Sequence, residues 1–113
     1  MTFEDVRTIA AEFPDLQVGP DAVKARGKLV ACIPRNKSAE PGSLVLRVDR
    51  TVRDGLIEDA PRTYYVTAHY AGYPAVLVRL EHTSPEVLRE LLRMARAYVL
   101  RKPSKKRGSG SSA

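Results

Sequence analysis

Two five-residue segments of the chain show the alternation of a half-buried β-strand. In LVLRV (44–48) the first, third and fifth residues are apolar, and Arg47 stands fourth. VLVRL (76–80) repeats the pattern, with Arg79 fourth. Successive side chains of a strand point to opposite faces, so each segment has one apolar face that must be covered. This restricts the chain to folds in which a sheet packs against helices on one face and carries Arg on the other.

Amphipathic segments at both ends of the chain can supply the helices. Apolar residues recur at helical spacing over 3–13, after Thr2 as a helix cap, and Pro14 disfavours helical geometry at the residue before it. Ser84 and Pro85 are typical of a second helix start. The apolar stripe of this longer helix extends to Val99.

The middle of the chain predicts strands and one short helix. We expect a turn-rich connection over 15–21, a hairpin of 22–25 and 28–33 around Arg26-Gly27, strands 43–49, 63–67 and 75–80, and a helix over 50–59. The predicted fold is therefore α+β, an antiparallel sheet with the N- and C-terminal helices packed on one face.

The net charge of +6 is unevenly distributed. Residues 1–100 hold fourteen Lys and Arg against all thirteen acidic residues, whereas residues 101–113 hold five Lys and Arg and no acid. We predict one folded domain over 1–101 and a basic, Gly/Ser-rich, disordered tail over 102–113. The high isoelectric point thus describes mainly the tail.

Compartment signals favour a soluble cytoplasmic protein. A single cysteine, Cys32, permits no internal disulfide, and no apolar run reaches the ~18–20 residues of a membrane span. The N-terminal segment has no basic region before its apolar residues, so it does not read as a signal peptide.

Three segments carry a resemblance to a known family. They are KARGKLVA (24–31), LVLRVD (44–49) and YYVTAHYAGYPAVLVRL (64–80), and T-x-H-Y-x-G-Y-P is the most specific part. The chain resembles the MmcQ/YjbR-like family of small bacterial proteins over about residues 2–100. The resemblance implies the double-wing α+β fold, related to the frataxin-like fold, and a DNA-binding label. This chain has Ala75 where relatives often carry Trp after Tyr-Pro.

The sheet face that carries Arg is the first candidate site. Arg47 and Arg79 share it, together with Tyr65 or Tyr64 according to register, and Lys28 is a further candidate for the same face. Such a face can bind nucleic acid, with Arg on phosphate and Tyr under a base, or it can be an ordinary solvated face. Val45 and Leu77 on the same face need cover from a partner, a second subunit or the tail.

The hairpin tip and one loop are further candidates. Lys24, Arg26 and Lys28 around Gly27 form a basic wing that can hold phosphate backbone, or simply a polar turn. The Tyr-rich loop 67–74 carries a candidate ligand or interaction site whose members are Tyr65, His69, Tyr70 and Tyr73. The alternative for the loop is that its rings only pack over a tight connection.

Motifs for catalysis and for metal binding are missing from the sequence. There is no Gly-rich phosphate loop, H-E-x-x-H or C-x-x-C, and Cys32 reads as a small core residue. The acidic residues Glu4, Asp5, Glu12 and Asp15 are interrupted by Arg7, which is typical of a solvated helix face and not of a metal ridge. We therefore predict no enzymatic activity, no metal and no cofactor.

Two functions remain open from the sequence. The first is non-specific binding of nucleic acid, DNA foremost, through Lys24, Arg26, Lys28, Arg47 and Arg79. The second is a protein-interaction or small-ligand-binding domain that uses the outer sheet face and the Tyr-rich loop. The predicted partners are accordingly DNA, or a protein partner or homodimer, and no membrane.

Overall fold

The computed structural model describes residues 1–101, so the predicted tail lies outside the described residues. The elements follow in the order α1 (Phe3–Ala10), β1 (Leu16–Val18), β2 (Ala22–Ala25), β3 (Lys28–Cys32), β4 (Ser43–Arg47), α2 (Arg50–Asp59), β5 (Tyr64–Tyr65), β6 (Ala75–Arg79), the 3₁₀ turn Leu80–His82 and α3 (Pro85–Arg101). Within this part of the chain no helix is long and apolar enough to cross a membrane.

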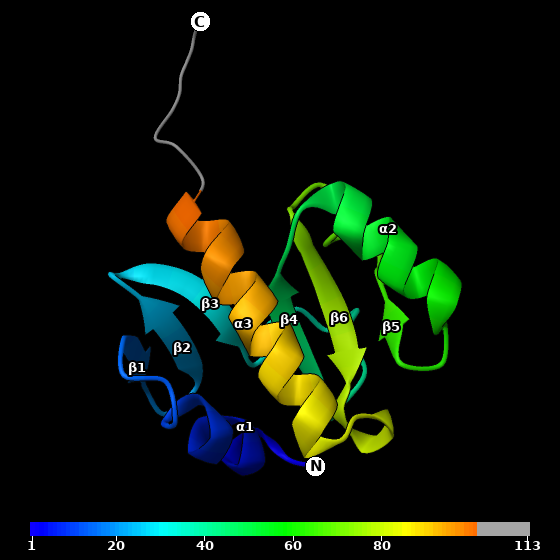
Figure 1. Ribbon diagram of the computed structural model, residues 1–113. Helices are drawn as coiled ribbons and strands as arrows, with labels where there is room; N and C mark the ends of the chain where they lie inside the picture. Colours follow the sequence, from blue (N-terminus) through cyan, green and yellow to red (C-terminus); the bar gives the residue numbers. More distant parts are fainter. Residues whose placement is uncertain (102–113) are drawn as a thin grey trace, which may run out of the picture.

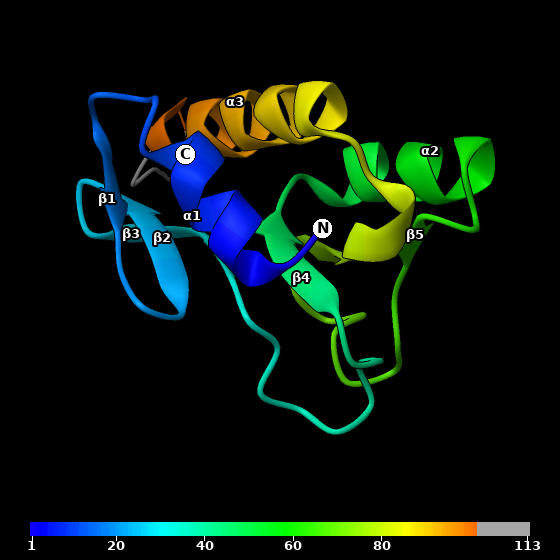
Figure 2. The same ribbon diagram turned by 90° about the horizontal axis from the view of Figure 1, so that it is seen from below.

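The six strands form one antiparallel sheet in the order β1-β2-β3-β4-β6-β5. Helices α1 and α3 lie on one face of it, so the predicted α+β class and the placement of the terminal helices are confirmed (Figure 1). Helix α2 lies on the same face, beyond the β6 and β5 side of α3, and the long loops project to the other side (Figure 2).

The pairing of β4 with β6 sets the two faces of the sheet. Leu44 lies opposite Val78 and Leu46 opposite Val76, and all four are completely buried beneath the helices. Val45 lies opposite Leu77 on the other face, as the alternation predicts. The sheet therefore has two apolar layers, a large one under the helices and a small one beneath the loops.

Helix α3 supplies most of the helical side of the core. It begins after Ser84, whose hydroxyl accepts a hydrogen bond from the Val87 N–H at 3.3 Å. Its buried stripe is Leu88, Leu91, Leu92, Ala95 and Val99. The helical spacing predicts these five residues together with Val87 and Tyr98, but Val87 is 42% exposed and Tyr98 is only partly buried. The stripe packs mainly over β3 and β4.

Strands β3, β4 and β6 end one or two residues earlier than the sequence predicts, and three differences are larger. Strand β1 pairs with β2 inside the stretch that the sequence predicts to be only a connection. The prediction missed it because a strand of three residues is too short to show alternation. Helix α1 ends at Ala10 and its chain continues to Phe13 in tighter i→i+3 turns, as helix ends often do. Strand β5 keeps only two residues, since the chain turns away at Val66.

The smaller apolar layer is covered by the chain itself. Tyr70 packs on Val45, Leu77 and Ala75, and partly buried residues from both long loops surround them. Val45 and Leu77 are consequently buried within the single chain, which differs from the expectation that cover comes from elsewhere. The sequence could not show this, because the loop that carries Tyr70 directly precedes β6 but has no local pattern that indicates a return over the sheet.

We predict that Leu88→Ala lowers the free energy of unfolding by about 2–5 kcal/mol, because a fully buried Leu leaves a cavity between α3 and the sheet. Urea denaturation followed by circular dichroism measures the change. Val87→Ala on the same helix is the control, since Val87 is 42% exposed and its truncation should cost far less. Equal losses from the two variants would contradict the placement of the α3 stripe.

Candidate functional site

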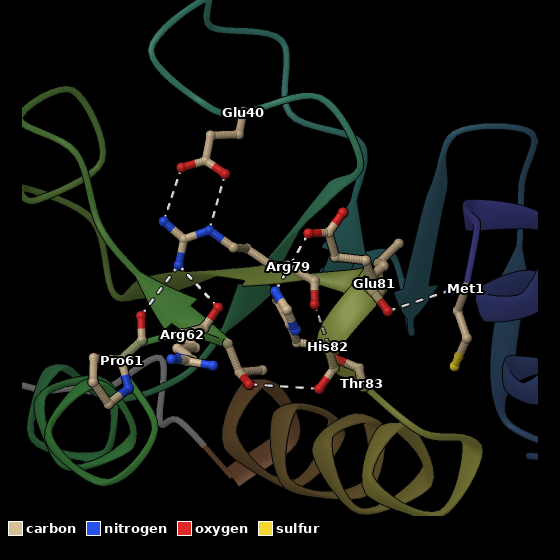
Figure 3. A network of polar contacts seen from close by, with 10 residues as sticks. Met1, Glu40, Pro61, Arg62, Arg79, Glu81, His82 and Thr83 are labelled. Atoms are coloured by element: carbon tan, nitrogen blue, oxygen red, sulfur yellow. Dashed lines mark hydrogen bonds and ion pairs between the residues drawn. The ribbon is translucent and has the colours of Figure 1, made fainter.

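Arg79 stands at the centre of a polar network on the outer face of the sheet (Figure 3). Its Nε and Nη2 donate to the two carboxylate oxygens of Glu40 at 2.9 and 2.8 Å, and its Nη1 donates to the carbonyls of Pro61 and Arg62 at 3.1 Å. The guanidinium also lies 4.2 Å from the centre of the Tyr65 ring. All three guanidinium nitrogens are thus engaged within the fold, and this network locks the 34–42 loop to the end of β6.

The network accounts for two of the predicted site residues in structural terms. Tyr65 lies opposite Leu77, which settles the register in favour of Tyr65 over Tyr64 on the outer face. Its hydroxyl shares a 2.5 Å hydrogen bond with the Ser43 hydroxyl and accepts from the Glu40 N–H at 2.8 Å. Arg79 and Tyr65 therefore hold the 34–42 loop in place, instead of forming an exposed surface on which bases can stack.

The rings of the Tyr-rich loop come together in one cluster. His69 meets Tyr70 edge-on with centroids 4.8 Å apart, and Tyr73 lies 6.0 Å from His69 and 6.5 Å from Tyr70. Tyr70 is buried, with its hydroxyl accepting a 3.3 Å hydrogen bond from the Asn36 N–H. Tyr73 is 54% exposed, so the cluster has one structural ring and one open to solvent.

The three cations of the hairpin do not form one wing surface. Arg26 and Gly27 both have positive φ, 53° and 79°, as the predicted two-residue hairpin turn requires. Lys24 lies opposite Leu29 on the face away from the helices. Lys28 points the other way, and its Nζ donates to the Val99 carbonyl at 3.4 Å near the end of α3.

Several cations gather around the last turn of α3. Besides Lys28, the Arg47 guanidinium lies 6.0 Å from the Tyr98 ring, and Arg50 lines a surface depression together with Tyr98. Arg26 lies in the hairpin turn, two residues before Lys28, and Arg101 is the last residue of the helix. We call these five residues, Arg26, Lys28, Arg47, Arg50 and Arg101, the basic end.

Ion pairs distinguish the basic end from most of the other arginines, and Arg62 is the exception among residues 1–101. Seven arginines within residues 1–101 lie within ion-pair distance of a carboxylate: Arg7, Arg35, Arg53, Arg79, Arg89, Arg93 and Arg96. None of the basic-end cations has such a partner in the described part of the chain. Arg47 donates from Nε to the Pro74 carbonyl at 3.2 Å, and Arg50 donates to the Gly72 carbonyl.

Arg50 and Arg101 were not among the predicted site residues. In the sequence, Asp49 and Asp54 stand directly beside Arg50 and Arg53, which makes them candidates to neutralise these two arginines. Asp54 does pair with Arg53, but Asp49 accepts the Thr51 N–H at 2.7 Å as the N-cap of α2. An Asp directly before a helix is a recognisable capping signal, and it indicates which carboxylate is already occupied.

The described residues hold no group of three His, Cys, Asp or Glu side chains placed to bind a metal ion. Cys32 and His69 line the same pocket without a hydrogen bond between them. Burial raises the pKa of the Cys32 thiol, more than nearby Arg35 lowers it. A raised pKa disfavours the thiolate, which is the form in which a cysteine acts as a nucleophile.

Comparison with known proteins shows the fold but not the activity. A crystal structure of Deinococcus radiodurans protein DR2400, described with the domain family DUF419, superposes with a TM-score of 0.64 and 23% identity. The match covers 93% of this chain and 82% of that chain. DUF419 is the YjbR/MmcQ-like family, so this chain has the fold of a solved domain of that family.

Similarity in sequence is more limited. No family model matches the chain. Uncharacterised proteins Rv2570 of Mycobacterium tuberculosis and Mb2600 of Mycobacterium bovis are 42% identical over 55 residues, which is 49% of this chain. The match spans only 41% of those relatives' length.

We predict that Arg79→Gln raises the pKa of Glu40. The hydrogen bonds from Arg79 hold that pKa below its ordinary value, helped by the charge of Arg79 and opposed by burial. A lowered carboxyl pKa means that the pair stabilises the fold above the ordinary pKa, and that this contribution is lost as pH falls through the lowered value. Carboxyl-carbon NMR titration measures the shift.

Glu12 is the control in the same spectra. Arg89 lowers the pKa of Glu12, so Arg79→Gln should leave it unchanged. A Glu40 that titrates at its ordinary value in the unmodified chain would contradict the network.

Proposed function

We propose that the chain is a YjbR/MmcQ-like domain that binds nucleic acid, DNA foremost, through the basic end. The observation that carries the proposal is the location of cations without ion pairs. Among residues 1–101, eight Lys and Arg side chains have no ion pair, and five of them form the basic end. There the sequence continues into Lys102, Lys105, Lys106 and Arg107 with no acidic residue. Phosphate contacts of this kind give affinity without sequence choice.

The end of α3 only partly neutralises these charges. A helix C-terminus carries the equivalent of roughly half a negative charge, and Lys28 and its neighbours stabilise it. The five positive charges of the basic end exceed this partial negative charge of the helix end by a wide margin. Four of them, Arg26, Lys28, Arg50 and Arg101, are exposed, which leaves donors directed to solvent for phosphate oxygens.

The proposal alters the residue set inferred from the sequence. Arg26, Lys28 and Arg47 are retained, while Arg50 and Arg101 are added. Arg79 is left out because Glu40 and two carbonyls already engage its nitrogens. Lys24 is left out because it faces away from α3.

A salt titration of duplex DNA binding tests the proposal. We expect the double variant Arg26→Gln/Lys28→Gln to bind more weakly and to flatten the slope of log K against log salt by about 2 units, because each lost phosphate contact removes about 0.9. Fluorescence anisotropy of a labelled duplex measures affinity at each salt concentration. Arg93→Gln is the charge-matched control, because Glu90 already pairs with Arg93 and the residue lies outside the basic end.

A chain that ends at Arg101 separates the domain from the residues beyond it. The proposal predicts that this shorter chain still binds at ~50 mM salt with a shallower slope, since its own cations remain. Absence of binding would assign the effect to residues 102–113 alone. An equal loss in Arg93→Gln would assign it to net charge rather than to the basic end.

A further inference from the structure

A pocket of about 330 Å³ opens on the sheet face away from the helices. Its floor is formed by side chains of β3, β4 and β6, among them Cys32, Val45 and Ala75. Tyr70 and Tyr73 of the Tyr-rich loop form one wall, and Ile33 after β3 contributes to another. Pockets for small molecules in proteins begin at roughly 300 Å³, so this one suits a ligand at the small end of that range.

The rim of the pocket is unusually apolar for an open surface. Residues 1–101 contain four large hydrophobic side chains that are exposed, and two of them, Tyr73 and Ile33, stand at this pocket. The rings of Tyr70 and Tyr73 are tilted by 57° with centroids 6.5 Å apart. A flat apolar body placed in the pocket against Tyr73 and Ile33 would cover apolar surface that is now exposed to water.

The charged residues that line the pocket are all basic. Arg35 and Arg47 contribute, together with His69, and no carboxylate lies among the lining residues. Arg35 is already paired with Asp21 at 3.1 Å and is largely exposed. Arg47 uses only Nε, in its bond to the Pro74 carbonyl, so its two terminal nitrogens have no hydrogen-bond acceptor in the described part of the chain.

We propose that this pocket binds a small aromatic carboxylate. The ring would lie against Tyr70, Tyr73 and Val45, and the carboxylate would accept hydrogen bonds from the terminal nitrogens of Arg47. Two adjacent nitrogens of one guanidinium match the two oxygens of one planar, singly charged anion. This activity is separate from nucleic-acid binding, although Arg47 takes part in both surfaces.

NMR titration of the full chain with 2-naphthoate tests the proposal. We expect amide shifts at Val45, Tyr73 and Ala75 and a dissociation constant of about 1 mM or tighter. The neutral isostere 2-naphthalenemethanol should bind at the same place about tenfold more weakly, because it lacks the charge-assisted hydrogen bonds.

Variants of the pocket separate recognition of the carboxylate from recognition of the aromatic ring. Arg47→Gln should reduce the affinity for 2-naphthoate to that for the alcohol, while Arg93→Gln, a loss of the same charge elsewhere, should leave it unchanged. Ala75→Leu should abolish binding of both compounds by filling the floor. If Ala75→Leu fails to fold, Tyr73→Ser decides, since Tyr73 lies at the rim and its loss should weaken both compounds together.

Failure of this proposal and of nucleic-acid binding can be told apart. Arg26→Gln/Lys28→Gln lies outside the pocket and should not alter the affinity for 2-naphthoate, and Tyr73→Ser should not alter the affinity for DNA. Absence of shifts, shifts confined to the last turn of α3, or equal affinity for acid and alcohol would each overturn the proposed aromatic carboxylate site.

Discussion

The antiparallel pairing of β4 with β6 is the constraint on which the rest of the structure depends. Its register places Val45 opposite Leu77, and it places Arg47 and Arg79 at opposite ends of the same face. A shift of one residue would turn every apolar side chain of one strand to the wrong face. The helices fix this register by burying Leu44, Leu46, Val76 and Val78, so the outer face follows from the packing of the inner one.

The two arginines of that face have different roles because loop residues accept hydrogen bonds from all three guanidinium nitrogens of Arg79 but from only one nitrogen of Arg47. Arg79 lies where the 34–42 loop returns to β4, and Glu40 and two carbonyls use its donors. Arg47 lies at the other end, where Pro74 satisfies one nitrogen only. Identical positions in two similar strands thus give one structural arginine and one that is available to a ligand.

The sequence predicted the features that depend on local periodicity and capping. The alternation in 44–48 and 76–80 and the Arg26-Gly27 turn are each contained in a few consecutive residues, and the structure confirms them. The stripe of α3 repeats along one helix and is confirmed except at its edges, where Val87 is exposed. Strand β1 was missed because its pairing with β2 is not visible in three residues. The roles of Tyr70 and Glu40 were also missed, because each meets partners about thirty or forty residues away in sequence.

The charged residues of the candidate site show the same limit of prediction from sequence. Lys24, Arg26 and Lys28 look equivalent in sequence, yet strand geometry sends Lys24 and Lys28 to opposite faces and brings Lys28 to the end of α3. A count of basic residues cannot distinguish Arg93, which is paired, from Arg26, which is not. Only the fold shows which charges remain for a partner.

Arg47 connects the two proposed activities energetically. It borders the pocket, and it also lies beside Tyr98 at the basic end. An anion on its terminal nitrogens would neutralise one of the charges offered to phosphate, so a pocket ligand and a nucleic acid would oppose each other's binding. Because such coupling is reciprocal, each would weaken the other by the same factor. One shared cation limits that factor to the contribution of a single phosphate contact, which is modest beside the contribution of the whole basic end.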